Sequence, residues 1–113
     1  MARSKIPGAL ERRHLVEKAL PAAQALAIAD AYLEQGRSLE AVDFLRIAEA
    51  GDKLAELRRG AIERGDVFLL RSVAAAERRD PTHDDWQRLA EAADRHGLGR
   101  YAIEARRQAD RGD

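Results

Sequence analysis

The 113-residue chain contains no cysteine, which excludes disulfide bonds, thiolate nucleophiles and cysteine-based zinc sites. Threonine occurs once, aromatic residues make up 4% of the chain, and no segment alternates polar and apolar residues with a period of two. Strands need such residues and such alternation, so we expect none. The chain also lacks the 18 or so consecutive apolar residues of a membrane helix and the apolar core of a secretory signal. We therefore expect a cytoplasmic protein without membrane contact.

An excess of charge of one sign is also missing, since 20 basic residues balance 20 acidic ones. Dedicated nucleic-acid-binding proteins usually carry a basic excess that offsets the phosphate charge, so we expect no nucleic-acid partner. The basic residues are 17 arginines and only 3 lysines, and the chain has 23 alanines. This bias is typical of GC-rich coding sequence, and we expect a bacterial source.

The residues that are abundant favour α-helices, because alanine, leucine, glutamate and arginine dominate the chain. Glycines follow apolar-periodic runs at four places where a helix is expected to end, namely Gly36, Gly51, Gly65 and Gly97. Helix starts are indicated by four residues suited to a first turn or an N-cap, namely Pro21, Ser38, Asp66 and Thr82. Thr82 has Asp85 three residues later, which is a variant of the capping box.

These signals predict an all-α protein of about seven helices in a single domain, 1–113. The helices are expected at 8–20, 22–35, 39–50, 53–64, 67–79, 83–96 and 99–110. Their short connections make consecutive helices antiparallel neighbours. The predicted organisation is a flexible tail at 1–7, a capping helix at 8–20, and three helical hairpins at 22–50, 53–79 and 83–110.

An internal repeat supports this organisation. Gly36, Gly65 and Gly97 are 29 and 32 residues apart, and similar residue types recur at fixed distances from each of them. Equivalent positions before and after each glycine hold Ala25, Leu54 and Trp86; Ile28, Leu57 and Leu89; Tyr32, Ala61 and Ala93; and Ala41, Leu70 and Ala102. A single hairpin cannot bury its apolar face, so repeated hairpins are expected to stack. We expect Ile28, Tyr32, Leu57, Trp86, Leu89 and Ala102 to be mostly buried.

The spacing of these residues resembles that of tetratricopeptide repeats. The first unit matches with Ala25, Ile28, Ala29, Tyr32, Gly36, Ala41, Leu45 and Ala48, and the third with Trp86, Leu89, Ala90, Ala93, Gly97, Ala102 and Ala109. The middle unit departs, because Arg58 and Glu77 occupy places that the family fills with small residues and Leu70 replaces an alanine. The resemblance covers about residues 22–110. It implies an α-solenoid, a right-handed stack of antiparallel hairpins that binds proteins.

In this family the first helix of each hairpin lines a concave groove. The resemblance therefore implies that a peptide or partner helix contacts Asp30, Leu33, Glu34, Arg59, Glu63, Arg88 and Glu91. A rival site is the apolar run 67–70, where four consecutive apolar residues cannot all face one core. Phe68 or Leu69 is expected either to pack on the neighbouring repeat or to mark an exposed interface.

No arrangement of residues in the sequence indicates catalysis. His14, His83 and His96 lie in different elements without metal-binding spacing, and the glycines are isolated. The acidic cluster around His83 could hold a cation, but acidic residues at a helix start are expected on dipole grounds. Four arginine pairs, at 12–13, 58–59, 78–79 and 106–107, form either a phosphate-tracking stripe or a solvated face. We expect no enzyme activity, no cofactor and no metal.

The sequence thus favours a module that binds another protein or a peptide. The alternative is a helical-repeat protein that associates with itself as a homo-oligomer, or a fragment of a longer array. Three units are close to the minimum for a stable stack, which keeps this alternative open.

Overall fold

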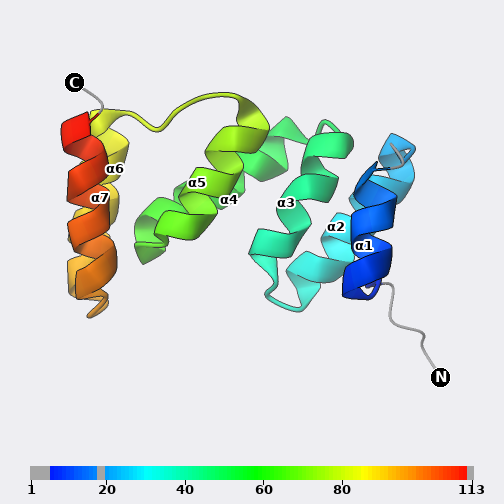
Figure 1. Ribbon diagram of the computed structural model, residues 1–113, viewed down its shortest axis with the longest axis horizontal. Helices are drawn as coiled ribbons and strands as arrows, with labels where there is room; N and C mark the ends of the chain where they lie inside the picture. Colours follow the sequence, from blue (N-terminus) through cyan, green and yellow to red (C-terminus); the bar gives the residue numbers. More distant parts are fainter. Residues whose placement is uncertain (1–5, 18–19, 112–113) are drawn as a thin grey trace. The chain divides into compact units, whose positions relative to one another are not determined.

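A computed structural model describes residues 6–17 and 20–111. The described residues form helices, turns and loops and include no strand, which confirms the all-α class (Figure 1). Seven helices follow one another: α1 (Ala9–Glu17), α2 (Ala22–Glu34), α3 (Ser38–Ile47), α4 (Gly51–Arg64), α5 (Val67–Glu77), α6 (His83–Arg95) and α7 (Gly99–Arg111). Most of the tail predicted at 1–7, and residues 18–19 of the predicted capping helix, lie outside the described residues.

The chain divides into two compact units, Met1–Leu54 and Ala55–Asp113, and the division falls inside α4. The first unit holds α1, α2, α3 and the start of α4. The second unit holds the rest of α4 and the helices α5, α6 and α7. The expectation of one domain built from three hairpins stays a prediction.

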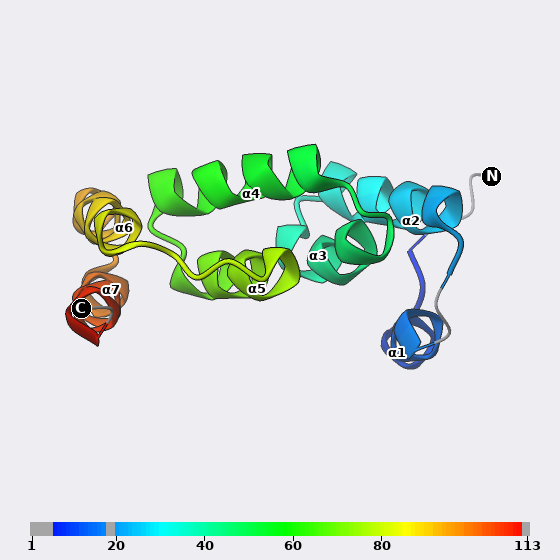
Figure 2. The same cartoon turned by 90° about the horizontal axis from the view of Figure 1, so that it is seen from above.

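In the first unit α2 and α3 form a hairpin, and they lie side by side in both views (Figures 1 and 2). Its centre is Tyr32, which is fully buried and stacks on Phe44 of α3 with 5.8 Å between ring centroids. The guanidinium of Arg37 lies over the Tyr32 ring, 4.9 Å from the ring centroid. The helix α1 packs on α3, where Arg12 and Asp43 approach to 3.7 Å.

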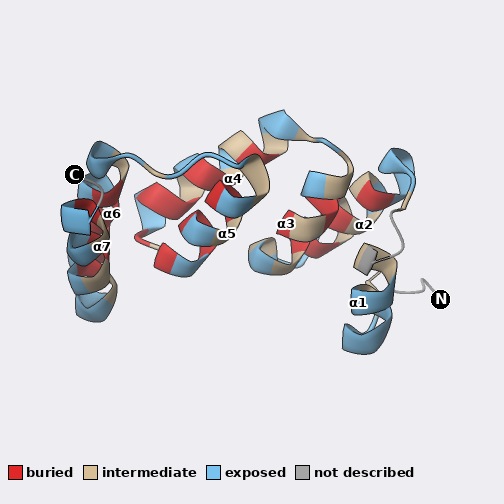
Figure 3. Ribbon diagram, turned by 45° about the horizontal axis from the view of Figure 1, so that its top comes forward, coloured by how far each residue is buried: buried red, intermediate tan, exposed pale blue. Residues whose placement is uncertain are grey.

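In the second unit α6 and α7 form a hairpin whose buried sides face each other (Figure 3). The α6 residues of the third repeat unit, Trp86, Leu89, Ala90 and Ala93, are all buried. The matching stripe of α7 contains only alanines, namely Ala102, Ala105 and Ala109. Alanines let two helix backbones approach closely, which explains why small residues recur at these places.

Three of the four glycines expected at helix ends adopt the left-handed conformation. At the end of α4, Gly65 has φ +73°, and the N–H of Asp66 donates to the carbonyl of Ala61 at 2.8 Å. This is a Schellman motif, which needs a left-handed residue. Gly36 and Gly97 end α2 and α6 in the same way, with φ of +71° and +73°. In each motif the accepting carbonyl belongs to the residue four positions before the glycine, namely Tyr32, Ala61 or Ala93. The shared turn geometry therefore accounts for the constant distance between these residues and the glycines.

Two helices end in the same motif without glycine. Glu49 after α3 and Arg78 after α5 have φ of 54° and 53°. The prediction that Gly51 ends a helix is therefore wrong: the left-handed residue is Glu49, and Gly51 is the first residue of α4. Ser38 is likewise not an N-cap, because it is the first residue of α3 and makes no capping hydrogen bond.

The predicted core is mostly confirmed. Tyr32, Trp86, Leu89 and Ala102 are buried. Ile28 and Leu57 are covered for the larger part of their surface, but less completely than these four. The buried stripe of α2 instead consists of Ala25, Ala29 and Tyr32.

Candidate interaction surfaces

The start of α6 is organised by a capping box. The hydroxyl of Thr82 accepts the N–H of Asp85 at 3.0 Å, and the Asp85 carboxylate accepts the N–H of Thr82 at 3.0 Å. The variant capping box predicted from the sequence is confirmed. The predicted N-cap at Asp66 is also confirmed, since its carboxylate accepts the N–H of Leu69 at 3.0 Å.

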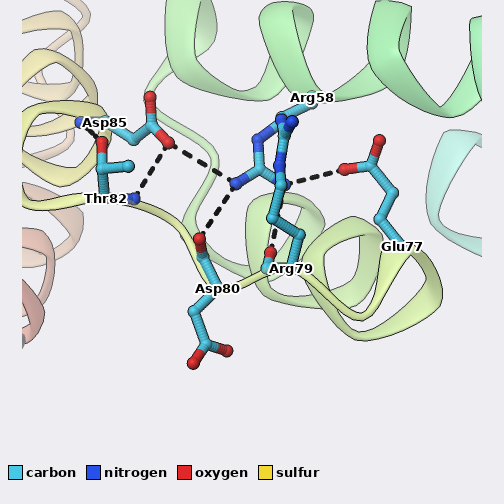
Figure 4. A network of polar contacts seen from close by, with 6 residues as sticks. All are labelled: Arg58, Glu77, Arg79, Asp80, Thr82 and Asp85. Atoms are coloured by element: carbon cyan, nitrogen blue, oxygen red, sulfur yellow. Dashed lines mark hydrogen bonds and ion pairs between the residues drawn. The ribbon is translucent and has the colours of Figure 1, made fainter.

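Arg58 of α4 is the centre of the most extensive polar network in the second unit (Figure 4). It is only 4% exposed, and no other charged side chain among the described residues is buried. Its Nη1 donates to the Glu77 carboxylate at the end of α5 at 2.7 Å. Nη1 also donates to the backbone carbonyl of Arg79 at 3.4 Å. Nη2 donates to the backbone carbonyl of Asp80 at 3.4 Å and approaches the Asp85 carboxylate at 3.5 Å.

This network joins α4, the end of α5, the α5–α6 connection and the start of α6 (Figure 4). Both guanidinium termini face acceptors of the protein, so Arg58 has little capacity left for a ligand. A buried arginine needs such partners, because an unpaired buried charge is costly. We therefore interpret the network as a structural clamp on the α4–α5 hairpin.

The clamp contains two of the residues by which the middle unit differs from the first and third units. Arg58 and Glu77 are the two departures from small residues, and they form an ion pair with each other. Sequence reasoning treated them as two separate deviations. Their opposite charges, at two positions where helices of one hairpin approach, were the signal that could have identified the pair.

The groove residues expected in the second unit are exposed. Arg59 and Glu63 lie one turn apart on α4, and Arg88 and Glu91 lie one turn apart on α6. None of these four side chains makes a hydrogen bond or ion pair within the described part of the chain. The ends of α4 and α6 touch, because a Cβ added to Gly65 would lie 2.5 Å from the Ala93 Cα.

The groove residues expected in the first unit differ among themselves. Asp30 is half-buried and binds the Lys53 ammonium at 2.6 Å, so its charge is already balanced. Leu33 is half-buried and Glu34 is exposed. Because these three residues belong to the other compact unit, their membership of one groove with the α4 and α6 residues stays a prediction.

The apolar run at the start of α5 separates into buried and exposed residues. Val67, Leu69 and Leu70 are buried, whereas Phe68 is 55% exposed. The Phe68 ring meets the Tyr101 ring of α7 edge to face, with 5.6 Å between centroids. Leu69 therefore packs inside, whereas Phe68 contacts α7 while about half of its surface remains exposed. That this exposed surface marks an interface stays a prediction.

A hollow of about 360 Å³ opens at the same end of the second unit, between the α4–α5 turn and the α6–α7 turn. It is lined by Arg64, Asp66, His96, Leu98 and Tyr101. Leu98 is itself 37% exposed. We call Arg64, Asp66, Phe68, Leu98 and Tyr101 the tip patch.

A second hollow of about 370 Å³ lies between α5 and α7. Its walls include Ala74 and Ala75 of α5, Trp86 of α6, and Gln108 of α7. Next to it, Arg71 of α5 binds Glu104 of α7 at 2.6 Å. The hydrogen bond from Gln108 to Glu104, together with Arg71, lowers the pKa of the Glu104 carboxyl below its ordinary value.

The remaining sequence features find structural roles. Arg58 is buried in the clamp, so the arginine pair at 58–59 cannot present two cations to a phosphate stripe. The His83 ring lies 3.0 Å from the Ala109 carbonyl, and the His96 ring lies 3.3 Å from the Glu63 carbonyl. Across residues 6–17 and 20–111, histidine and carboxylate side chains do not gather in a group of three that could hold a metal ion. In the same residues, every helix is too short or too polar to span a membrane.

Comparison with known proteins returned no match: no family model, no curated protein and no solved structure is similar to this chain.

Proposed function

We propose that this chain is a protein-interaction module of the tetratricopeptide type, which binds a peptide or partner helix along the first helices of its hairpins. We place it in the cytoplasm, and the proposal includes no catalysis, no cofactor and no nucleic-acid partner. The support comes from the all-α hairpins, the glycine-anchored repeat and the balanced charge of the chain.

The observation that carries the proposal is the set of four exposed charges on α4 and α6. Arg59, Glu63, Arg88 and Glu91 neither cover the core nor pair with other described residues. Two cations and two anions on adjacent helices suit a partner of complementary mixed charge. Such complementarity mainly raises the association rate and sets specificity.

Charge reversal on these helices tests the proposal. The tagged chain and an Arg59→Glu/Arg88→Glu variant are compared for the proteins that they retain, and a retained protein is then purified and titrated against both. We expect the double reversal to weaken binding about tenfold or more, mainly through slower association. Stability should stay within about 0.5 kcal/mol of the parent, because both side chains are exposed.

The matched control reverses two other exposed arginines, Arg46 of α3 and Arg100 of α7. Both lie on second helices of hairpins and have no side-chain partner among the described residues. The control should bind like the parent. Equal loss of binding in both variants, or loss in the control alone, would contradict the assignment to α4 and α6.

Self-association is the second candidate function. The exposed aromatic ring of Phe68 beside an open hollow favours it. None of the four charged residues on α4 and α6 lines this hollow.

A further inference from the structure

The tip patch has an exposed projection and a hollow next to each other. Phe68 is 55% exposed, and its ring contacts the Tyr101 ring edge to face. Tyr101 also lines the hollow of about 360 Å³, together with Leu98. We propose that the tip patch is a two-fold interface between two copies of this chain, in which Phe68 of each copy enters the hollow of the other.

The shapes fit this arrangement. A two-fold interface uses the same surface on both copies, so that surface must be complementary to itself. A projecting ring beside a hollow meets this requirement, because rotation brings each ring to the other copy's hollow. Hollows of about 300 Å³ and above accommodate small ligands, so the space is sufficient for one aromatic side chain. The half-exposed Leu98 supplies further apolar surface at its edge.

The charges of the patch fit it as well. Arg64 and Asp66 both line the hollow and carry opposite charges. The Arg64 guanidinium lies along α4 over Gly60, where an added Cβ would be 3.2 Å from its terminal nitrogens. It has no acidic partner among the described residues. One oxygen of the Asp66 carboxylate caps α5, and the other takes part in no interaction described in the structure. Each copy thus offers one cation and one carboxylate oxygen without a partner at this surface, and we expect Arg64 of one copy to pair with Asp66 of the other.

The whole chain favours a second copy over a partner of strong charge. Its formal net charge at pH 7 is zero, so two copies do not repel each other at long range. Within the patch one cation balances one anion, which gives a strongly acidic or basic partner no advantage. The patch is small, because it comprises two connections between helices and the helix ends beside them. It is therefore expected to form a weak dimer, with a dissociation constant in the micromolar range or above.

Sedimentation velocity and light scattering of the full chain, from about 5 to 500 µM, test the inference. We expect a reversible monomer–dimer equilibrium for the parent. Phe68→Glu should weaken dimerisation about 30-fold or more, because it removes a central aromatic anchor. Arg64→Glu should weaken it about tenfold, because each copy then presents two acidic residues to the other.

The matched control is Ile103→Glu. Ile103 of α7 is 60% exposed and apolar but does not line the hollow, so this variant should dimerise like the parent. A circular dichroism melt accompanies each variant, and only variants that unfold like the parent are compared. A parent that stays monomeric at 500 µM would overturn the inference. Equal dimerisation of the parent and Phe68→Glu would overturn it too.

The lack of cysteine allows a second, independent measurement. Leu98→Cys introduces one thiol at the edge of the hollow, and Ile103→Cys introduces one outside it. Under mild oxidation we expect Leu98→Cys to form a covalent dimer several-fold faster than Ile103→Cys. Equal rates would contradict the interface. The Arg59→Glu/Arg88→Glu variant should dimerise normally, so this experiment and the test of partner binding can fail separately.

Discussion

At the scale of single residues, Gly65 meets two requirements at once. Its φ of +73° favours glycine, and an added Cβ would lie 2.5 Å from Cα and 2.6 Å from the backbone nitrogen of Ala93. Backbone atoms of α6 cannot move aside as a flexible side chain can. We expect Gly65→Ala to lower the free energy of unfolding by roughly 3 kcal/mol or more, because both the backbone strain and the collision must be accommodated.

Gly36 and Gly97 are the controls for this prediction. They have nearly the same φ, and a Cβ added to either would meet no atom within 4 Å. In their alanine variants the free energy of unfolding should fall by only about 1 kcal/mol, because alanine disfavours the left-handed conformation. Urea denaturation of the three variants measures the difference. Similar losses at all three positions would mean that the approach of α4 to α6 is looser than described.

The residues that the sequence could and could not predict differ in a physical way. Gly36, Gly65 and Gly97 were identifiable because glycine tolerates positive φ better than any other residue. Glu49 and Arg78 also have positive φ, although glutamate and arginine disfavour it. The residue types at these two positions therefore give no indication of a left-handed conformation. The misplaced helix end at Gly51 has the same origin. A glycine near the expected end of a helix does not determine which residue at that end adopts the left-handed conformation.

At the scale of helices, the Arg58 clamp determines how α4, α5 and α6 meet. Replacing Arg58 with Met leaves the Glu77 carboxylate, whose side chain is only 16% exposed, without its 2.7 Å partner. We expect the free energy of unfolding to fall by about 2 to 3 kcal/mol. This is less than the cost of breaking a fully buried ion pair, because the Glu77 carboxylate can still be partly hydrated. The double variant Arg58→Met/Glu77→Met should be at least about 1 kcal/mol more stable than Arg58→Met alone.

The comparison for this cycle is the Arg71–Glu104 pair. Its two side chains are 43% and 30% exposed, so solvent screens their attraction. Arg71→Met should therefore cost less than about 1 kcal/mol. Thermal and urea unfolding of the parent and the three variants measure these differences. If Arg58→Met and Arg71→Met were equally destabilising, the Arg58 network would contribute no more to stability than an exposed ion pair does.

In the α2–α3 hairpin, Tyr32 links stability to high pH. Burial raises the pKa of its hydroxyl above the ordinary value, although the cations Arg12 and Arg37 oppose this shift. The folded state then keeps a proton that the unfolded state releases near pH 10. The stability that depends on this proton is complete below about pH 10 and is lost as the pH rises through the folded pKa.

Tyr32→Phe removes the titrating hydroxyl and should reduce this loss of stability at high pH. The chain has only one other tyrosine, so Tyr101→Phe is the natural control and should retain the loss. The measurement is the urea midpoint of each variant at about pH 8 and about pH 11. An unchanged pH dependence in Tyr32→Phe would show that other groups govern unfolding in base.

The helices themselves were largely predictable, because helix formers and most of the glycines and caps indicate the same boundaries. The predicted helix 67–79 is observed at Val67–Glu77, and the predicted helix 83–96 at His83–Arg95. The interaction surfaces were less predictable. Exposure of Phe68 depends on how α5 meets α7, and the occupation of Asp30 depends on Lys53, which is distant in sequence. Periodicity along one helix contains neither kind of information.

At the scale of the whole molecule, the division of the chain within α4 has a testable consequence. The clamp, the Gly65–Ala93 approach, the Phe68–Tyr101 contact and the Arg71–Glu104 pair all lie between residues 51 and 113. A fragment 51–113 contains all of α4 and therefore retains every one of these contacts. We expect it to be helical and to unfold cooperatively, although less stably than the full chain because small domains bury a smaller share of their surface.

The complementary fragment 1–50 should be the weaker of the two. It loses Lys53, which binds Asp30 of α2, and its helix α1 has no buried residue among positions 9–16. Circular dichroism melts and amide exchange of both fragments test the contrast. Introducing Arg58→Met into the fragment 51–113 should abolish its cooperative unfolding transition. The destabilisation caused by this substitution is then a large part of the fragment's small free energy of unfolding. A fragment 51–113 that is unfolded at room temperature would show that the second unit depends on the first for its stability.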